Sequence, residues 1–219
     1  MQIAIDGPAG AGKSTVAKAL AKKLGIMYLD TGAMYRGVAL HMLNCSIELD
    51  REDKVKKALE TVDFQVVYED GVQKIYLEGE DVSQKIRENH VSKAASDFSA
   101  LKSVREFLVK MQQETARKND CILDGRDIGT CVLPHADFKF YLTASSLERA
   151  KRRAKELMEK GTPVDVEVIQ KEIEERDYND SHREFSPLRQ ADDAILVDST
   201  EMNAEEVIAF VEKIIKEGK

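Results

Sequence analysis

The sequence contains little cysteine, no tryptophan and no long hydrophobic segment. Its three cysteines, Cys45, Cys121 and Cys131, lie far apart and form no C-x-x-C pair. This argues against a disulfide framework or a structural zinc site and favours a reducing compartment. No apolar run approaches the roughly 18 residues that a membrane-spanning helix needs. Residues 1–6 carry no basic segment and begin no long apolar one, so we expect no signal peptide and a cytoplasmic location.

An excess of positive charge is also missing. The 219 residues include 33 Lys plus Arg against 40 Asp plus Glu, for a formal net charge of -7. We therefore expect neither nucleic acid nor a membrane surface as a partner, and any polyanion must bind at a local cationic site. With 42% hydrophobic and 33% charged residues, the composition is that of a globular chain.

Short apolar segments alternate with helical patterns along most of the chain. The strand candidates are residues 3–6, 27–30, 121–124, 138–142 and 194–197. The helix candidates are residues 14–24, 33–43, 53–62, 91–117, 147–160, 164–183 and 204–216. This alternation predicts an α/β fold with a five-stranded parallel sheet flanked by helices.

Two segments interrupt this alternation. Residues 64–68 and 73–77 are rich in β-forming side chains and flank Asp70-Gly71. An Asp-Gly pair between such runs predicts a β-hairpin, which we interpret as an insert. Farther along, Gly161-Thr162-Pro163 breaks the helical pattern between residues 147–160 and 164–183.

A phosphate-binding loop is the clearest motif. Gly7-Pro8-Ala9-Gly10-Ala11-Gly12-Lys13-Ser14 fits G-x-x-x-x-G-K-[ST] and lies between a predicted strand and a predicted helix. Backbone N–H groups and the helix N-terminus would hold phosphate oxygens there. Lys13 would reach the β- and γ-phosphates, and the Ser14 hydroxyl would hold Mg²⁺. The expected ATP-binding residues are Gly7, Pro8, Ala9, Gly10, Ala11, Gly12, Lys13, Ser14 and Thr15.

The motifs of other phosphate-loop proteins are missing. The chain contains no N-K-x-D or D-x-x-G, which guanine-nucleotide switches use, and no S-G-G-Q of transporter ATPases. A small chain with this loop and many downstream arginines points to phosphoryl transfer onto a small acceptor.

Two further motifs follow predicted strands, where open α/β sheets bind ligands. The first, residues 30–36, supplies a carboxylate, a hydroxyl and Arg36. The second begins with Asp124, which we expect to be the second carboxylate near Mg²⁺. In this motif Arg126 would meet a phosphate, and Asp127 could accept hydrogen bonds from an amino group.

Arginines gather on the two helices that flank the Gly161-Thr162-Pro163 break. Arg149, Arg152 and Arg153 lie before it, and Arg176, Asp180 and Arg183 share one helix face after it. They predict a lid that closes over the triphosphate and excludes water.

Several motifs together resemble those of the bacterial cytidylate (CMP/dCMP) kinase family, over essentially the whole chain. They are residues 5–14, 30–36, 77–83, 124–130 and 175–177. The resemblance implies a nucleoside-monophosphate-kinase fold in one domain: a core of about residues 1–62, 84–146 and 184–219, a monophosphate-binding insert of about 63–83, and a lid of about 147–183. It also implies transfer of phosphate from ATP to CMP or dCMP with Mg²⁺, in pyrimidine nucleotide metabolism. We expect a monomer.

The resemblance assigns individual residues as well. It implies that the base contacts Thr31, Arg105, Asp127 and Arg183. It implies that the pentose contacts Ser96, Arg176 and Asp180, and that the acceptor phosphate contacts Arg36 and Arg126. The expected catalytic side chains are Lys13, Arg126, Arg149 and Arg153, and the expected metal ligands are Ser14 and Asp124.

Three alternatives remain open on the sequence. Another small-molecule kinase, such as shikimate kinase, would share the phosphate loop, although the hairpin insert and residues 124–130 count against it. A regulatory ATPase would need no second set of arginines. A scaffold protein would need neither Lys13 nor a lid.

Overall fold

The computed structural model describes residues 1–69, 71–159, 161 and 163–218. Asp70 of the expected hairpin turn, and Lys160 and Thr162 around the expected helix break, lie outside these residues. The chain forms two compact units. The first unit comprises Met1–Tyr28 and Asp120–Lys219, and the second unit comprises Leu29–Asn119. In the described part of the chain, no helix is long and apolar enough to cross a membrane.

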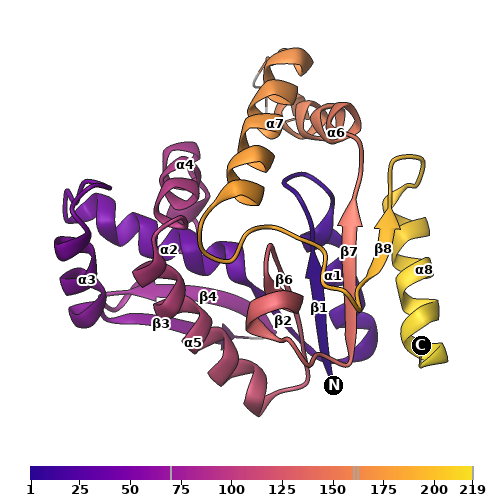
Figure 1. Ribbon diagram of the computed structural model, residues 1–219, viewed down its shortest axis with the longest axis horizontal. Helices are drawn as coiled ribbons and strands as arrows, with labels where there is room; N and C mark the ends of the chain where they lie inside the picture. The colour runs from indigo at the N-terminus through magenta and orange to yellow at the C-terminus, as the bar shows by residue number, and fades with distance from the viewer. Residues whose placement is uncertain (70, 160, 162, 219) are drawn as a thin grey trace. The chain divides into compact units, whose positions relative to one another are not determined.

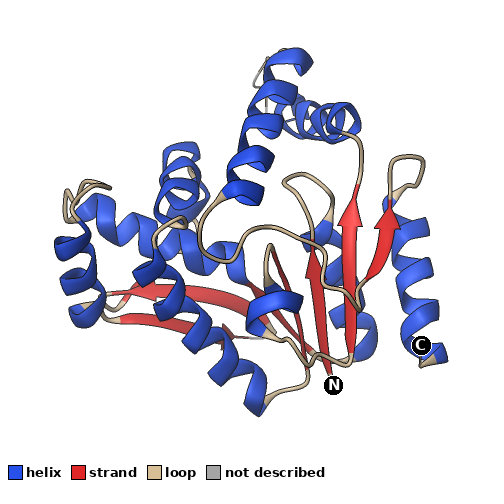
Figure 2. Ribbon diagram, viewed as in Figure 1, coloured by secondary structure: helices blue, strands red, loops and turns tan. Residues whose placement is uncertain are grey.

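A five-stranded sheet in the order β2-β6-β1-β7-β8 confirms the predicted sheet (Figures 1 and 2). Its strands are β1 (Gln2–Asp6), β2 (Met27–Asp30), β6 (Cys121–Gly125), β7 (Phe138–Thr143) and β8 (Ile195–Asp198). β1 pairs in parallel with both β6 and β7, and β8 pairs in parallel with β7. The register places Ile5 beside Asp124 and Asp6 beside Gly125, so β1 and β6 end at the same edge of the sheet.

Four α-helices and one short helix complete the first unit. They are α1 (Lys13–Leu24), α6 (Ser146–Glu159), α7 (Val166–His182), α8 (Ala204–Glu217) and the π-helix η2 (Ile128–Val132). Asn203 and Glu206 form a capping box at the start of α8, which satisfies backbone N–H groups that the first turn leaves unpaired. Gly25 ends α1 in the left-handed conformation, with a φ of 67°.

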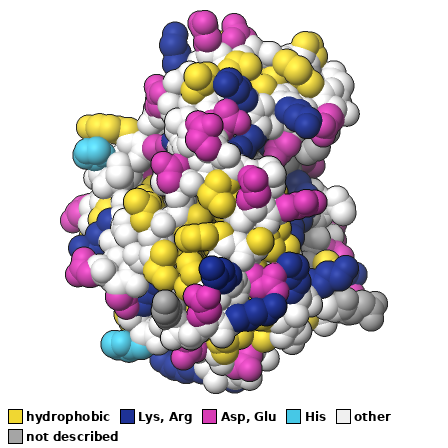
Figure 3. Space-filling model, turned by 90° about the vertical axis from the view of Figure 1, so that its right-hand side faces the viewer, with side chains coloured by type: hydrophobic (Ala, Val, Ile, Leu, Met, Phe, Trp, Pro, Cys, Tyr) yellow, Lys and Arg dark blue, Asp and Glu magenta, His cyan; other side chains and the backbone are white. Residues whose placement is uncertain are grey.

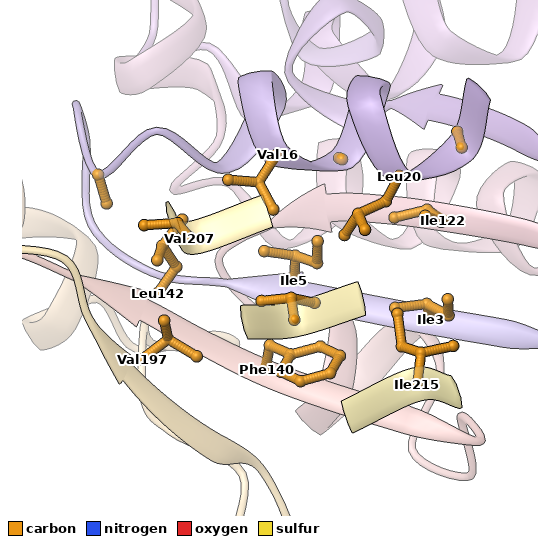
Figure 4. Close-up of a cluster of buried hydrophobic side chains, with 14 residues drawn as sticks. Ile3, Ile5, Val16, Leu20, Ile122, Phe140, Leu142, Val197, Val207 and Ile215 are labelled. Atoms are coloured by element: carbon orange, nitrogen blue, oxygen red, sulfur yellow. The ribbon is translucent and has the colours of Figure 1, made fainter. Parts of the chain in front are cut away.

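The main core of the first unit joins its strands to α1 and α8. Figure 4 shows Val16 and Leu20 of α1 facing Ile5 and Ile122 of the sheet, beside Phe140. Burial of this apolar stripe holds α1 against the strands, which fixes the loop between β1 and α1. A smaller cluster packs α6 against α7 through Ala150, Ala154, Ile169 and Ile173.

The second unit contains the remaining helices and a three-stranded sheet in the order β3-β4-β5. Its elements are α2 (Thr31–Asn44), α3 (Glu52–Thr61), β3 (Phe64–Glu69), β4 (Val72–Leu77), β5 (Glu80–Asp81), the 3-10 helix η1 (Lys85–Arg87), α4 (Asn89–Phe98) and α5 (Lys102–Lys118). β3 and β4 pair antiparallel, which confirms the predicted hairpin. A side chain on Gly37 of α2 would lie 2.5 Å from the Phe64 ring, so this glycine allows α2 to pack closely on the hairpin.

The predicted helix over residues 91–117 is wrong, because α4 and α5 are separate helices. The backbone of Leu101 is extended, with φ -76° and ψ 130°, and interrupts the helical pattern. The Arg105 guanidinium donates to the Ser99 carbonyl at 3.2 Å. This bond satisfies a carbonyl at the end of α4 that would otherwise lack a helical partner. The sequence patterns also did not predict β5, η1 or η2.

Charges of both signs are interspersed on the face shown in Figure 3, around a group of hydrophobic side chains. This view is from the side where β8 and α8 lie in Figure 1. Leu196 of β8 and Phe210 of α8 are the large hydrophobic side chains of these elements that stay exposed, at 54% and 43%.

Candidate functional site

The phosphate loop connects the end of β1 to the start of α1. Gly7 has a φ of +146°, and a side chain there would lie 1.9 Å from the Leu142 carbonyl oxygen. Gly12, with a φ of 89°, takes the left-handed conformation that begins α1. The two glycines therefore permit a backbone path that other residues would strain.

Lys13 is almost completely buried, with 6% of its surface exposed. Its Nζ donates a hydrogen bond of 2.7 Å to the Pro8 carbonyl, so the ammonium lies over the phosphate loop. Burial, followed by the positive charge of Arg126, lowers the pKa of Lys13 well below its usual value. Phosphate oxygens beside this ammonium would counter both effects.

Ser14 and Asp124 meet at the edge of the sheet. The Ser14 hydroxyl donates to Asp124 Oδ2 at 2.7 Å, and the Tyr28 hydroxyl donates to Asp124 Oδ1 at 2.8 Å. Hydroxyl and carboxylate oxygens are the hard ligands that Mg²⁺ prefers, so this donor set fits the ion. Among the described residues, no group of three or more His, Cys, Asp or Glu side chains could hold a metal.

An ion-pair network links the loop after β6 to α7. Arg126 Nε donates to Asp180 Oδ2 at 2.7 Å, and Arg183 Nη1 lies 3.7 Å from Asp180 Oδ1. Arg183 Nη2 also lies 3.9 Å from Asp127 Oδ1. Burial would raise the pKa of Asp180, but the charge and hydrogen bond of Arg126 outweigh burial, and the pKa is lowered. The structure thus brings Arg126, Asp127, Asp180 and Arg183 together.

Arg149 of α6 is buried against the phosphate loop. Its Nη1 donates to the Ala9 carbonyl at 2.8 Å, its Nε donates to the Ala144 carbonyl at 2.9 Å, and its Nη2 lies 2.6 Å from Asp177. The Ala9 N–H in turn donates to Asp177 at 3.3 Å. Arg149 and Asp177 therefore bind both polar backbone groups of one phosphate-loop residue.

The other expected arginines of α6 and α7 have different surroundings. Arg152 donates to the Ser199 carbonyl at 2.6 Å, which ties α6 to the turn after β8. Arg153 is largely exposed and pairs with Glu156 at 3.1 Å. Arg176 is exposed on α7, and its charge contributes to the lowered pKa of Asp180.

In the second unit, Asp30 organises the start of α2. Its carboxylate accepts from the Ala33 N–H at 2.8 Å and lies 3.4 Å from Arg36 Nη2. The Gln73 amide from β4 bonds both the N–H and the carbonyl of Asp30, at 2.7 and 3.1 Å. Thr31 is buried beside this cap, and Arg36 Nε is buried without a hydrogen-bond partner.

Arg105 and Ser96 are the other expected site residues of the second unit. Arg105 is buried and lies 5.4 Å from the centre of the Tyr35 ring, at a distance typical of cation–π contacts. Ser96 lies near the end of α4, where its carbonyl accepts from the Ser99 hydroxyl at 2.8 Å. The break between α4 and α5 therefore places these residues on separate helices.

Comparison with known proteins extends these observations to the whole chain. The family model of cytidylate kinase matches residues 3–217. The chain belongs to the cytidylate kinase family. A cytidylate kinase of Caldicellulosiruptor saccharolyticus is 53% identical over 96% of this chain and 93% of its own length. Cytidylate kinases of Lactobacillus johnsonii and Carboxydothermus hydrogenoformans are each 50% identical, over 99% and 98% of this chain and 94% and 97% of their own lengths.

Solved structures agree on the fold of this cytidylate kinase family member. A shikimate kinase of Acinetobacter baumannii, in complex with shikimate, superposes with a TM-score of 0.50 at 16% identity, covering 100% of this chain and 94% of its own. An uncharacterized protein of Eubacterium ventriosum gives a TM-score of 0.55 at 13% identity, covering 99% and 98%. These structures agree with a phosphate-loop nucleotide-binding fold, and membership of the cytidylate kinase family makes the protein a kinase.

Several side chains of this cytidylate kinase family member support expected site residues and were not predicted from sequence. Tyr28 bonds Asp124, Gln73 bonds Asp30, and Asp177 pairs with Arg149. Tyr28 and Gln73 lie in strands, β2 and β4, and belong to no recognisable motif. Asp177 belongs to the motif at residues 175–177, which could have identified it.

Proposed function

We propose that this protein transfers the γ-phosphoryl group of ATP to CMP and dCMP, as a magnesium-dependent monomeric enzyme of pyrimidine nucleotide metabolism in the cytoplasm. The observation that carries the proposal is the arrangement of Lys13, Ser14 and Asp124 in a chain of the cytidylate kinase family. It combines a phosphate loop with a donor set that suits Mg²⁺.

The donor nucleotide binds through the phosphate loop, residues 7–15. Backbone N–H groups of the loop and the N-terminus of α1 hold the phosphate oxygens, and Lys13 contacts the β- and γ-phosphates. Ser14 and Asp124 would hold Mg²⁺, which would neutralise charge that develops on the transferred group. Arg149 supports the loop through Ala9, while the exposed Arg153 could approach the nucleotide from α6.

The acceptor nucleotide has three parts to be bound: the phosphate, the pentose and the base. Arg36 and Arg126 bind its phosphate, and the buried, unpaired Nε of Arg36 is a donor suited to that role. Ser96, Arg176 and Asp180 contact the pentose. Thr31, Arg105, Asp127 and Arg183 contact the base.

Recognition of cytosine follows from hydrogen-bond chemistry. The base presents an N4 amino group that donates, and O2 and N3 that accept. The Asp127 carboxylate can accept from N4, and the guanidinium of Arg183, 3.9 Å away, can donate to the ring. Uracil presents O4 to the same carboxylate and leaves it unpaired, at a cost of about 1–3 kcal/mol. UMP is therefore a poor acceptor.

The transfer needs no covalent intermediate on the protein. An oxygen of the acceptor phosphate attacks the γ-phosphorus in line, and the bond to the β-phosphate oxygen breaks. Lys13 and Arg126 stabilise the negative charge that spreads over the transferred group. Closure of residues 147–183 over the nucleotides excludes water, the competing acceptor.

A coupled assay of ADP release tests the proposal. The protein with Mg·ATP receives CMP, dCMP, UMP, AMP, GMP, dTMP or shikimate in separate reactions. We expect ADP release with CMP and dCMP far above that with the other acceptors. Release without any acceptor would identify an ATPase, release with shikimate or another monophosphate would identify a different kinase, and no release would identify a scaffold.

A further inference from the structure

Asp6 is a buried carboxylate to which the sequence motifs assign no role. It is the last residue of β1, and only 4% of its surface is exposed. Its two oxygens accept hydrogen bonds from two successive backbone N–H groups, those of Ile128 at 2.8 Å and Gly129 at 2.7 Å. A charged side chain in this setting needs such partners to offset the loss of water.

These N–H groups belong to the two residues that directly follow Asp127. The carbonyl of Asp127 accepts from the N–H groups of Cys131 and Val132, at 2.9 and 3.2 Å. Asp127 is thus tied to η2 through its own carbonyl, while Asp6 holds the first two residues of η2.

Gly129 permits the close approach of Asp6. A side chain at this position would lie 3.3 Å from Asp6 Oδ2 and 3.2 Å from Cδ of Lys139. Both distances are tighter than most contacts of a Cβ atom. The lack of a side chain at Gly129 therefore lets the backbone after Asp127 come within hydrogen-bonding distance of the Asp6 carboxylate.

We propose that Asp6 is a positioning residue for recognition of the acceptor base, because it fixes the backbone that carries the Asp127 carboxylate. The inference rests on the proposed function, in which Asp127 accepts from the amino group of cytosine. Asp6 contacts no substrate and acts only through the loop.

A carboxylate is required because both of its partners donate. Two carboxylate oxygens can accept from two N–H groups at once. An asparagine of the same shape has one accepting oxygen, and its amino group would face the other N–H. Asp6→Asn therefore removes one hydrogen bond, creates a clash between two donors and frees the Asp127 segment to shift.

The test compares the wild-type protein with Asp6→Asn, Asp127→Asn and the double variant, all confirmed as folded by thermal unfolding. For each we measure kcat, the KM for CMP, the KM for ATP and the ratio of kcat/KM for CMP over UMP. We expect Asp6→Asn to raise the KM for CMP about tenfold, because small displacements of a positioning group have effects of at least this size. The KM for ATP should change less than about twofold.

The double variant separates positioning from general damage. If Asp6 acts through Asp127, then Asp6→Asn lowers the CMP-over-UMP ratio in the wild-type protein but not in the Asp127→Asn background. Asp137→Asn is the matched control, because Asp137 also accepts from a backbone N–H, that of Gln2 at 2.6 Å, at the other end of β1. We expect the control to leave both KM values unchanged.

Gly129→Ala provides a second route to the same hydrogen bonds, for use if Asp6→Asn does not fold. The added Cβ would lie 3.3 Å from Asp6 Oδ2 and press on it, so the CMP-over-UMP ratio should again fall while the KM for ATP is kept. Equal effects of Asp6→Asn on CMP and ATP, or an undiminished effect in the Asp127→Asn background, would overturn the role of Asp6. A wild-type protein that does not phosphorylate CMP would instead overturn the proposed function and this inference with it.

Discussion

The Ser14 hydroxyl donates a 2.7 Å hydrogen bond to the carboxylate of Asp124, which lies 110 positions away in the sequence. The bond is possible because β1 and β6 are adjacent parallel strands that end together, so the start of α1 lies beside the end of β6. The two oxygens that we propose as magnesium ligands thus come from distant segments and meet at one edge of the sheet.

Replacement of Ser14 or Asp124 should weaken the binding of Mg²⁺ during phosphoryl transfer. We expect Ser14→Ala and Asp124→Asn each to raise the Mg²⁺ concentration for half-maximal activity about tenfold or more, because a metal ion contributes several kcal/mol to such reactions. A magnesium titration of phosphoryl transfer at saturating ATP measures this, with the exposed Asp50→Asn as the control. Titration curves that coincide with the wild type would show that neither residue holds the ion.

Removal of the Lys13 ammonium should act on turnover. We expect Lys13→Ala to lower kcat about 10²-fold or more, because a buried donor that meets developing charge contributes this much. Lys22→Ala is the matched control, since Lys22 lies on the same helix but is exposed. Steady-state kinetics would contradict the role of Lys13 if the variant retained near-wild-type turnover.

Asp127 should determine the preference for cytosine. We expect Asp127→Ala to reduce the CMP-over-UMP ratio about tenfold, within the 1–3 kcal/mol of one buried hydrogen-bond mismatch, with a smaller effect on the KM for ATP. Parallel assays with the two acceptors measure this ratio. An unchanged ratio would mean that another group reads the base.

The two glycines at positions 7 and 25 should differ in their tolerance of a side chain, although both have positive φ. A Cβ on Gly7 would overlap the Leu142 carbonyl oxygen, whereas nothing lies within 4 Å of a Cβ on Gly25. We expect Gly25→Ala to cost about 1 kcal/mol in the free energy of unfolding and Gly7→Ala to cost about 3 kcal/mol or more. Chemical denaturation gives both values, and equal losses would contradict the steric explanation.

Asp6 should make stability depend on pH in an unusual direction. Burial raises its pKa from 3.8 to about 6, against the effect of its two hydrogen bonds; the charge of Asp127 adds to the rise and that of Lys13 opposes it. The folded protein therefore binds this proton more tightly than the unfolded chain. The stabilisation that the folded protein gains from this bound proton is complete below about pH 4. It is lost as the pH rises through about 6.

The comparison with Asp6→Asn isolates this effect, because the variant lacks the titrating group. At about 1.4 kcal/mol per pH unit, the unfolding free energy of the wild type relative to the variant should fall by about 2 kcal/mol between pH 4 and pH 7. Denaturant unfolding at several pH values measures the difference. A difference that is constant, or that rises with pH, would show that burial does not raise the pKa of Asp6.

Much of the fold could be predicted because it depends on local patterns. The five apolar segments and the hairpin at β3 and β4 occur close to their predicted places, since strand burial and the turn are recorded in neighbouring residues. The break between α4 and α5 could not be predicted, because helical periodicity continues on both sides. Arg105 supports that break through the Ser99 carbonyl, a contact that periodicity does not reveal.

The candidate site likewise contains features that the sequence predicts and contacts that it does not. The chemical groups of the phosphate loop, Asp124 and the motif around Asp127 were identifiable from sequence, because each type of chemistry needs particular side chains at particular spacings. The supporting contacts were not identifiable. Tyr28 and Gln73 each bond an expected site residue from a strand whose local pattern carries no motif. Asp177 lies in the motif at residues 175–177, but its ion pair with Arg149 joins two helices and is not recorded in either local pattern.

By itself, then, the amino-acid sequence determined the class of this protein, the five strands of its parallel sheet and the hairpin, and the side chains that we propose hold phosphate and magnesium. Only the tertiary structure decided which of these groups meet: Ser14 with Asp124, Arg126 with Asp180, and Asp6 with the backbone after Asp127. The physical reason is that hydrogen bonds and ion pairs form over about 3–4 Å, so they depend on how distant strands are placed side by side. That placement is set by packing of the whole sheet against its helices.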